Sequence, residues 1–227
     1  MKKLFVIIFL LLSTSIYAEE ESSFWSKTDE FLLKGTEWIS KKDKITGMRS
    51  LNTTTDKEAK KRGIQQLNWY VQYAKKSNIK VFKSGDAEYE RVQNIFDRVI
   101  KSSHYKNDKD IRFEVIDFED ENAMAFGGGY FVVLTGLMKV ANDDELAYVI
   151  AHELAHNSAG HIEEQEHYMR MKDVFGDKPT SVEKTVFTNI SEQEADRVGI
   201  VYTALAGFDP CASATYWEKQ KTNISSY

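Results

Sequence analysis

Two histidines four residues apart, with a glutamate between them, have the clearest chemical potential in this sequence: His152-Glu153-Leu154-Ala155-His156. On an α-helix, residues four apart share a face and lie roughly 6 Å apart along the axis, so both imidazoles can reach one metal ion. Glu153 lies beside them, where its carboxylate can contact a metal-bound water without becoming a ligand. If the stretch is helical, the motif predicts two zinc ligands and a general base. The alternative is a chance match, which is rare in a chain of this length.

The residues around this motif favour the helix that it requires. Asn142 followed by Glu145 fits a capping box, and Asp143 and Asp144 place negative charge on the first turn, where the helix dipole favours it. Gly160 marks the expected end. The apolar residues of this segment fall on a face away from the two histidines: Leu146, Ala147, Ile150 and Leu154. We therefore expect a helix that packs one face into the core and turns its histidines toward a cleft.

Two histidines need a third protein ligand, because a catalytic zinc commonly has three protein ligands and one open position for water. His161 is one candidate, but it lies one residue short of the metzincin spacing and about 180° around the helix from His152. Glu192 is a better candidate and shares a helical face with Asp196, whereas Glu194 points elsewhere. Glu192 could complete the site while Asp196 accepts a hydrogen bond from a ligand imidazole. Taken alone, this charged run would be a solvated helix face.

A strand pattern precedes the motif. Residues 111–117 alternate apolar and polar side chains, as a half-buried strand does, and residues 130–135 are almost continuously apolar. Between these two segments stand three glycines, followed by the first residue of the second strand: Gly127, Gly128, Gly129 and Tyr130. Glycines allow positive φ angles and the close approach of another backbone. This block could be an ordinary hairpin turn, or an edge beside the metal cleft where an extended substrate peptide pairs as an added strand.

Helical patterns dominate the rest of the chain. Apolar periodicity and helix stop signals predict four further helices: 24–40, 57–77, 86–104 and 192–206. Another helix is expected to begin at Asp209-Pro210. With 227 residues, of which 42% are hydrophobic, the chain can bury one sizeable core. We predict an α+β, mainly helical fold with a small mixed β-sheet packed on the helix of the two histidines.

The first 18 residues have the features of a Sec-type signal peptide. Lys2 and Lys3 precede an apolar run from Leu4 to Leu12, and a polar stretch ends at Ala18 before three glutamates. The apolar run is too short to favour a membrane-spanning helix. We expect cleavage after Ala18 and a soluble chain that is exported to the periplasm or secreted.

The expected mature chain is acidic and has a single cysteine. Removal of the two lysines in residues 1–18 leaves 28 basic against 35 acidic residues, a formal charge of −7. An acidic surface argues against nucleic acid as a partner. Because Cys211 is the only cysteine, no intrachain disulfide can form. Stability must therefore come from packing, with assistance from a bound metal.

Five blocks of sequence, in order, carry a family resemblance. They are Asn122-Ala123 with Gly127-Gly128-Gly129-Tyr130, Asp144 to Ala147, His152 to His156, Glu192 to Gly199, and Ala206 to Pro210. Together they resemble peptidase family M48, which includes the CAAX prenyl endopeptidases, HtpX and the secreted bacterial proteases of the BepA type. The resemblance covers about residues 86–221 and departs from the family pattern at Gly127, where proline is usual.

The resemblance implies a zincin-like fold and a gluzincin site with one zinc ion per chain, in which Glu192 is the third zinc ligand and Asp196 matches the family's aspartate. It also implies an edge strand that binds the substrate. The expected activity is hydrolysis of peptide bonds in misfolded or envelope proteins, with a zinc-activated water and Glu153 as general base. The resemblance therefore implies polypeptide substrates, and it is also compatible with association with membrane or envelope proteins. The substrate identity and the oligomeric state are not written in the sequence.

The resemblance also suggests a domain division and an alternative function. We expect residues 19–85 to form an N-terminal helical segment and residues 86–227 the catalytic core. Periplasmic relatives often continue past the helix of Trp217 into a Ser-His-Pro segment that this sequence lacks, so we expect a compact, minimal protease domain. The alternative is a zinc-bound chaperone or binding module of the envelope with little peptidase activity. The intact base Glu153 favours the protease.

Overall fold

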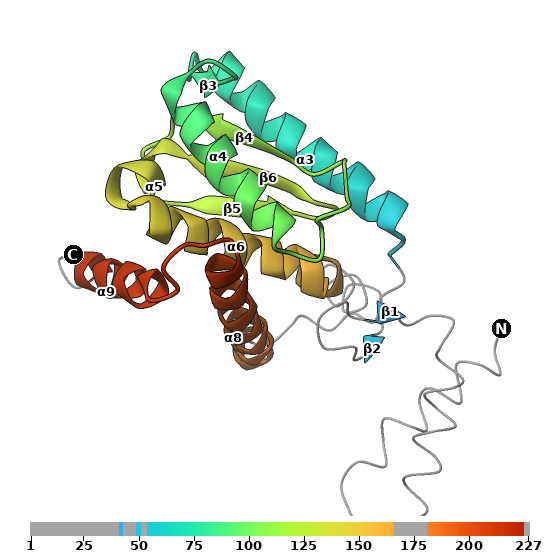
Figure 1. Cartoon of the computed structure of the whole chain (residues 1–227). Coiled ribbons are helices and arrows are strands. Elements are labelled where there is room, and N and C mark those ends of the chain that lie inside the picture. The colour runs from blue at the N-terminus through green and yellow to red at the C-terminus, as the bar shows by residue number, and fades with distance from the viewer. Residues whose placement is uncertain (1–40, 43–48, 51–53, 166–180, 225–227) are drawn as a thin grey trace, which may run out of the picture. The chain divides into compact units, whose positions relative to one another are not determined.

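The computed structural model describes residues 41–42, 49–50, 54–165 and 181–224, all within one compact unit that spans residues 41–227 (Figure 1). The expected signal peptide, residues 1–18, and the predicted helix 24–40 lie outside the described residues. The proposed division at residues 85 and 86 stays a prediction. Within the described ranges, we find no helix with the length and apolar character needed to span a bilayer.

The fold is α+β and mainly helical, as the sequence predicts. Two short antiparallel strands, β1 (Lys41–Lys42) and β2 (Arg49–Ser50), lie in the sequence between the predicted helices 24–40 and 57–77. The other described elements follow in chain order: α3 (Asp56–Lys76), β3 (Val81–Phe82), α4 (Ala87–Lys101), β4 (Arg112–Ile116), β5 (Ala123–Phe126), β6 (Tyr130–Leu134), α5 (Thr135–Val140), α6 (Asp143–Ala159), α8 (Ser181–Leu205) and α9 (Ala212–Ile224).

A four-stranded mixed sheet with the order β3-β4-β6-β5 forms the centre of the fold. The two predicted strands, β4 and β6, pair in parallel in the middle, with Phe113 opposite Phe131. β5, a strand that the sequence analysis did not assign, pairs antiparallel with β6 and forms one edge of the sheet. Residues 127–129 make the turn between β5 and β6, so these glycines do occupy a hairpin.

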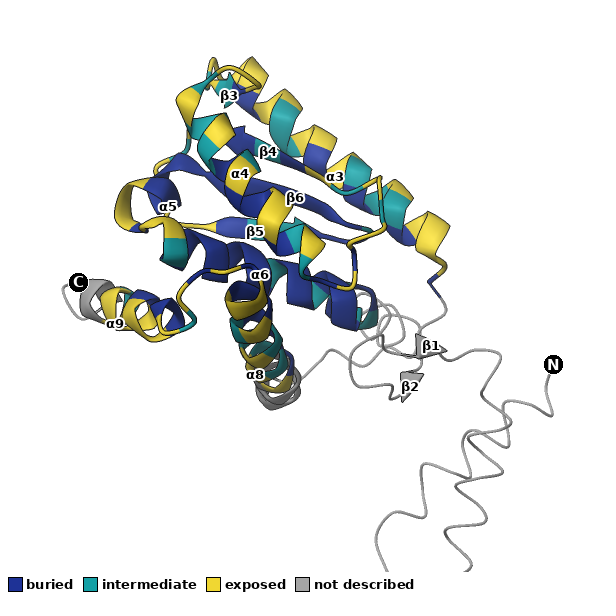
Figure 2. Ribbon diagram, in the orientation of Figure 1, coloured by how far each residue is buried: buried dark blue, intermediate teal, exposed yellow. Residues whose placement is uncertain are grey.

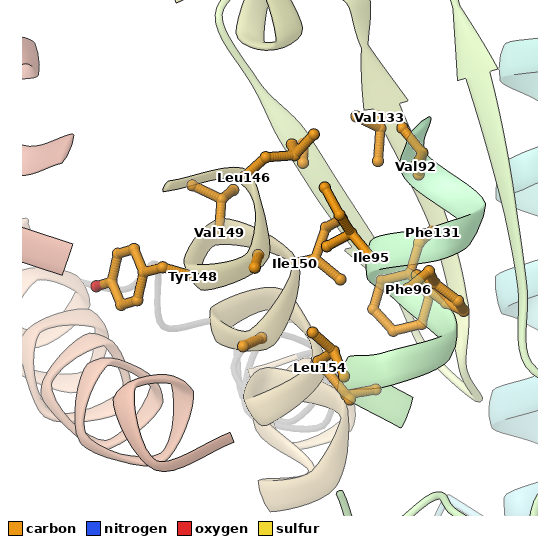
Figure 3. Close-up of a cluster of buried hydrophobic side chains, with 14 of the residues drawn as sticks. Val92, Ile95, Phe96, Phe131, Val133, Leu146, Tyr148, Val149, Ile150 and Leu154 are labelled. Carbon is orange, nitrogen blue, oxygen red and sulfur yellow. The ribbon is translucent and has the colours of Figure 1, made fainter. Parts of the chain in front are cut away.

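The two faces of the sheet are covered by different helices. Alternate side chains of β6 point to opposite faces. Phe131 and Val133 belong to a core cluster with α4 and α6, part of which Figure 3 shows. Val132 and Leu134 belong to a second cluster with residues of α3. β6 is therefore buried on both faces, which explains its continuously apolar sequence.

Helix α6 has the bounds that the capping signals predict. The Asn142 side chain accepts a hydrogen bond from the Glu145 N–H, and the Glu145 carboxylate accepts one from the Asn142 N–H, both at 2.9 Å. Gly160 ends the helix in the left-handed region at φ 77°. The N–H groups of Asn142 and Glu145 thus both have acceptors, and Gly160 ends the helix. The signals at both ends come from residues that lie close to the helix ends in sequence.

Helix α6 is buried along most of its length and packs against α8. The contact is close at Gly199 of α8, where an added Cβ would lie 3.0 Å from both the backbone nitrogen and the Cα of His152. Glycine at this position lets the backbone of α8 approach the first histidine of the motif. Helix α9 also packs on α6, with Lys219 Nζ lying 2.7 Å from the Glu145 carboxylate.

Candidate metal centre

Three side chains from α6 and α8 bring their ligand atoms together. Among the described residues, His152, His156 and Glu192 form a group whose potential ligand atoms all lie within 4.8 Å of one another. The Nε2 atoms of the two histidines are 3.1 Å apart. Glu192 Oε2 lies 3.2 Å from the Nε2 of His152, and Oε1 lies 3.4 Å from the Nε2 of His156. These are the three residues that the sequence indicates as metal ligands, and their binding of a metal stays a prediction.

The separations fit the donor set of a zinc ion. Zinc bound to nitrogen and oxygen at about 2.0–2.2 Å in a tetrahedral site separates neighbouring ligand atoms by about 3.3–3.6 Å. The two Nε2 atoms are 3.1 Å apart, and each lies 3.2 or 3.4 Å from one of the two Glu192 carboxylate oxygens, so the separations are close to this range. Two imidazole nitrogens and a carboxylate that converge in this way present electron pairs to a common point, which favours a cation there.

Asp196, with Tyr148 beside it, lies on the Nδ1 side of the His152 ring. Asp196 Oδ1 is 3.0 Å from the Nδ1 of His152 and accepts a hydrogen bond of 2.7 Å from the Tyr148 hydroxyl. The indole N–H of Trp217 in α9 donates to the same hydroxyl at 2.8 Å. A carboxylate near Nδ1 favours the N–H at that nitrogen, so the neutral form of the ring directs the lone pair of Nε2 at the ligand cluster.

The ionisable groups of the cluster shift one another's pKa values. The close histidines His152 and His156 hold the pKa of the Glu192 carboxyl well below its usual range, so this ligand is ionised at neutral pH. Burial disfavours the imidazolium form of His152, but contacts with Asp196 and Glu192 outweigh burial and raise the pKa of His152 to about 9. Burial by itself would raise the pKa of Asp196. The contacts with His152 and Tyr148 outweigh burial and lower this pKa below its usual value. These carboxylates create a site with a strong preference for positive charge.

Glu153 reaches from α6 to the edge strand of the sheet. Its Oε2 accepts a hydrogen bond of 2.8 Å from the backbone N–H of Ala125 in β5. Burial raises the pKa of Glu153, while the charges of His152 and His156 and this hydrogen bond oppose the rise. The carboxylate is therefore held between α6 and the edge strand by a backbone donor.

The glycine block lies farther along the same hairpin. The Gly129 N–H donates to the Asn157 side chain at 3.1 Å, next to His156 in α6. On its other side the turn contacts α3, because a Cβ on Gly63 would overlap the carbonyl oxygen of Gly127. Gly127, Gly129 and Tyr130 are buried and Gly128 is half-buried. The turn therefore contacts both α3 and α6. Within this hairpin, Ala125 of β5 is the residue that contacts Glu153.

Two residues beside the ligand cluster, Tyr148 and Trp217, are not among those predicted from the sequence. Tyr148 precedes His152 by four residues and so lies on the same face of α6, a spacing that could have indicated its role. Trp217 reaches Tyr148 from α9 and has no local signal. His161 contacts the Nδ1 of His156 and does not join the three ligand atoms.

Part of the chain is similar in sequence to known peptidases. The model of peptidase family M48 matches residues 86–176. The chain is 31% identical over 133 residues to a beta-barrel assembly-enhancing protease of Escherichia coli (strain K12), covering 47% of this chain and 27% of the relative. It is 26% identical over 154 residues to the mitochondrial metalloendopeptidase OMA1 of Saccharomyces cerevisiae, covering 57% of this chain and 45% of the relative. The matched part thus spans less than half the length of either relative.

Proposed function

We propose that this protein is a zinc metalloendopeptidase that hydrolyses peptide bonds of misfolded or envelope proteins, since the model of peptidase family M48 matches residues 86–176. The observation that carries the proposal is the convergence of His152, His156 and Glu192 on one point, with Glu153 directed between this cluster and an edge strand. The three ligands would hold one zinc ion per chain. A bound zinc ion supplies a Lewis acid and lowers the pKa of a water molecule in its open position.

In this mechanism the protein supplies the base and the orientation. Glu153 accepts a proton from the attacking water as the water oxygen adds to the scissile carbonyl carbon. The same carboxyl group then delivers that proton to the amide nitrogen, the carbon–nitrogen bond breaks, and a carboxylic acid and an amine form, which exchange a further proton to give a carboxylate and an ammonium ion. No covalent intermediate with the enzyme forms. The raised pKa of Glu153 suits a group that must accept a proton and release it again.

We also propose that the substrate lies along β5. Backbone groups of successive residues in a strand alternate in direction, and the Ala125 N–H is directed at Glu153 and not at β6. The outward backbone groups of Ala123 and Ala125 are therefore on the side where an extended peptide could add as a further strand. A peptide paired there would pass beside Glu153. The turn from Gly127 to Tyr130 would hold the end of this strand in place.

The proposed substrates and location rest on the relatives and on the N-terminal sequence. Two relatives are named as a beta-barrel assembly-enhancing protease and a metalloendopeptidase, which supports polypeptide substrates. The basic and apolar residues at positions 1–18 support export to the periplasm or secretion. The acidic charge of the chain disfavours nucleic acid as a partner.

The test compares zinc content and casein cleavage in the wild type and in Glu153→Gln. We expect the wild type to bind one zinc ion per chain and to cleave casein, and Glu153→Gln to bind zinc but lose cleavage. Glu119→Gln removes an exposed carboxylate by the same chemical change and should remain active. A purified wild type that binds zinc and cleaves nothing would refute the peptidase and favour the zinc-bound chaperone or binding module.

A further inference from the structure

His161 and Glu194 form a relay that ends on the second histidine of the motif. The Nδ1 atoms of His161 and His156 are 3.1 Å apart. On the other side of its ring, the Nε2 of His161 lies 3.4 Å from the Oε2 of Glu194 in α8. The side chains of His161 and Glu194 are only 8% and 22% exposed, so this contact is largely shielded from solvent.

The end of α6 makes this contact possible. In a continuous helix, His161 would lie five residues beyond His156, about 140° around the axis, and the two rings would point apart. Gly160 adopts a left-handed conformation and ends the helix at this point. The chain changes direction there, so that the ring of His161 faces the ring of His156 and also meets α8.

The chemistry of the three groups defines the direction of each hydrogen bond. An ionised carboxylate can only accept, so the Nε2 of His161 carries a proton and donates to Glu194. In a neutral His161 ring the Nδ1 is then an acceptor, and the Nδ1 of His156 must be the donor. His156 therefore keeps the lone pair of its Nε2, the atom that faces His152 and Glu192.

We propose that His161 and Glu194 are positioning residues that select the tautomer and the ring orientation of His156 for metal binding. The inference deepens the proposed function, because the metal is the zinc ion assigned above. Helix α8 then serves both histidines: Asp196 acts directly on the Nδ1 of His152, and Glu194 acts through His161 on the Nδ1 of His156. The groups that orient a metal-bound histidine commonly contribute 10–100-fold to metal affinity.

The experiment compares His161→Leu with His161→Gln. Leucine has no hydrogen-bonding group, whereas the glutamine amide can accept from His156 and donate to Glu194. We expect His161→Leu to bind Zn²⁺ about 10–100-fold more weakly in a chelator competition, and His161→Gln to recover most of this loss. His104→Ala, which removes an exposed histidine outside the ligand cluster, should leave the affinity unchanged.

A second measurement reports on the tautomer itself. Long-range proton–nitrogen NMR of ¹⁵N-histidine protein should show the proton of His156 on Nδ1 in the wild type and a changed signal in His161→Leu. Wild-type zinc affinity in His161→Leu, or a His156 proton on Nε2 in the wild type, would overturn the proposal. If His161→Leu does not fold, Glu194→Leu is held to the same two criteria.

The two proposals can fail separately. If the wild type binds no zinc, the proposed function is wrong, and NMR of the zinc-free protein still decides whether His161 directs the tautomer of His156. If the wild type binds zinc and cleaves casein while His161→Leu matches it in affinity and in the His156 signal, only the relay is wrong.

Discussion

Helices α6 and α8 both supply residues to the metal centre, but their surroundings differ. Most residues of α6 are buried between the sheet and its helical neighbours, whereas the described side chains of α8 alternate between buried and exposed (Figure 2). Helix α8 exposes large apolar residues on its outer face, including Val201 at 53% and Leu205 at 66%. Only its inner face, which includes Glu192, Asp196 and Gly199, meets the histidines.

Because of this difference, we expect α6 and α8 to have different roles at the site. Helix α6 is a rigid part of the core, so the positions of His152, His156 and Glu153 follow from the packing of the whole domain. Helix α8 supplies Glu192 to the proposed ligand cluster and places Asp196 beside the Nδ1 of His152. Changes on α6 away from the site should therefore affect folding, and changes on the inner face of α8 should affect metal binding.

Zinc removal should have the largest effect, because the metal would join the two helices. At a free zinc concentration about 1,000 times Kd, we expect zinc to add about 4 kcal/mol to the free energy of unfolding, and EDTA to remove this gain. Glu192→Ala should lose the gain without a chelator. Urea denaturation with and without zinc measures both effects, and an equal zinc effect in Glu192→Ala would exclude Glu192 as a ligand.

Gly199→Val tests the close contact between the two helices. The Cβ alone would lie 3.0 Å from backbone atoms of His152, so α8 must shift away from α6. We expect overpacking to cost about 1–3 kcal/mol of unfolding free energy and to weaken zinc binding as well. Ala204→Val adds the same residue on the exposed side of α8 and should keep wild-type zinc affinity. Equal behaviour of the two variants would mean that the contact at Gly199 is not needed.

Asp196→Ala tests the direct support of His152 by α8. Loss of the carboxylate beside Nδ1 removes the group that favours the metal-binding tautomer, so we expect zinc affinity to fall about 10–100-fold. Chelator competition gives the ratio of affinities. Gln193→Ala, at an exposed position on the same turn, is the control and should show no change.

Asn142→Ala tests α6 away from the metal centre. The variant loses the side-chain acceptor of the capping box, which should cost about 1 kcal/mol of unfolding free energy. The zinc affinity of the folded protein should be unchanged, and Asn142→Ser should restore the stability. A large fall in zinc affinity would contradict the separation of folding and metal binding between the two helices.

Val201→Ala should have the smallest effect. The side chain is exposed on the outer face of α8, away from the ligands, so we expect a change in unfolding free energy within about 0.5 kcal/mol. Thermal denaturation and zinc titration measure it. A larger loss of stability would indicate that the outer face of α8 is covered by another part of the protein.

Local signals explain why much of the fold could be predicted. The start and end of α6 depend on Asn142, Glu145 and Gly160, which act within a few residues of the helix. The buried strand β6 was predicted from its continuous apolar sequence. In contrast, β5 was not assigned, because the sequence Ala-Met-Ala-Phe has no polar alternation and its pairing depends on β6.

The sequence by itself determined the helix of the two histidines and the types of residue that could bind a metal, because helix periodicity and capping act over short distances along the chain. Only the tertiary structure decided which carboxylates reach which ring nitrogens. Glu192, Glu194 and Asp196 follow His152 by some forty residues, and they meet the histidines because Gly199 lets α8 pack closely on α6. Likewise, the turn at Gly160 brings His161 back to His156, a contact that regular helix periodicity does not predict.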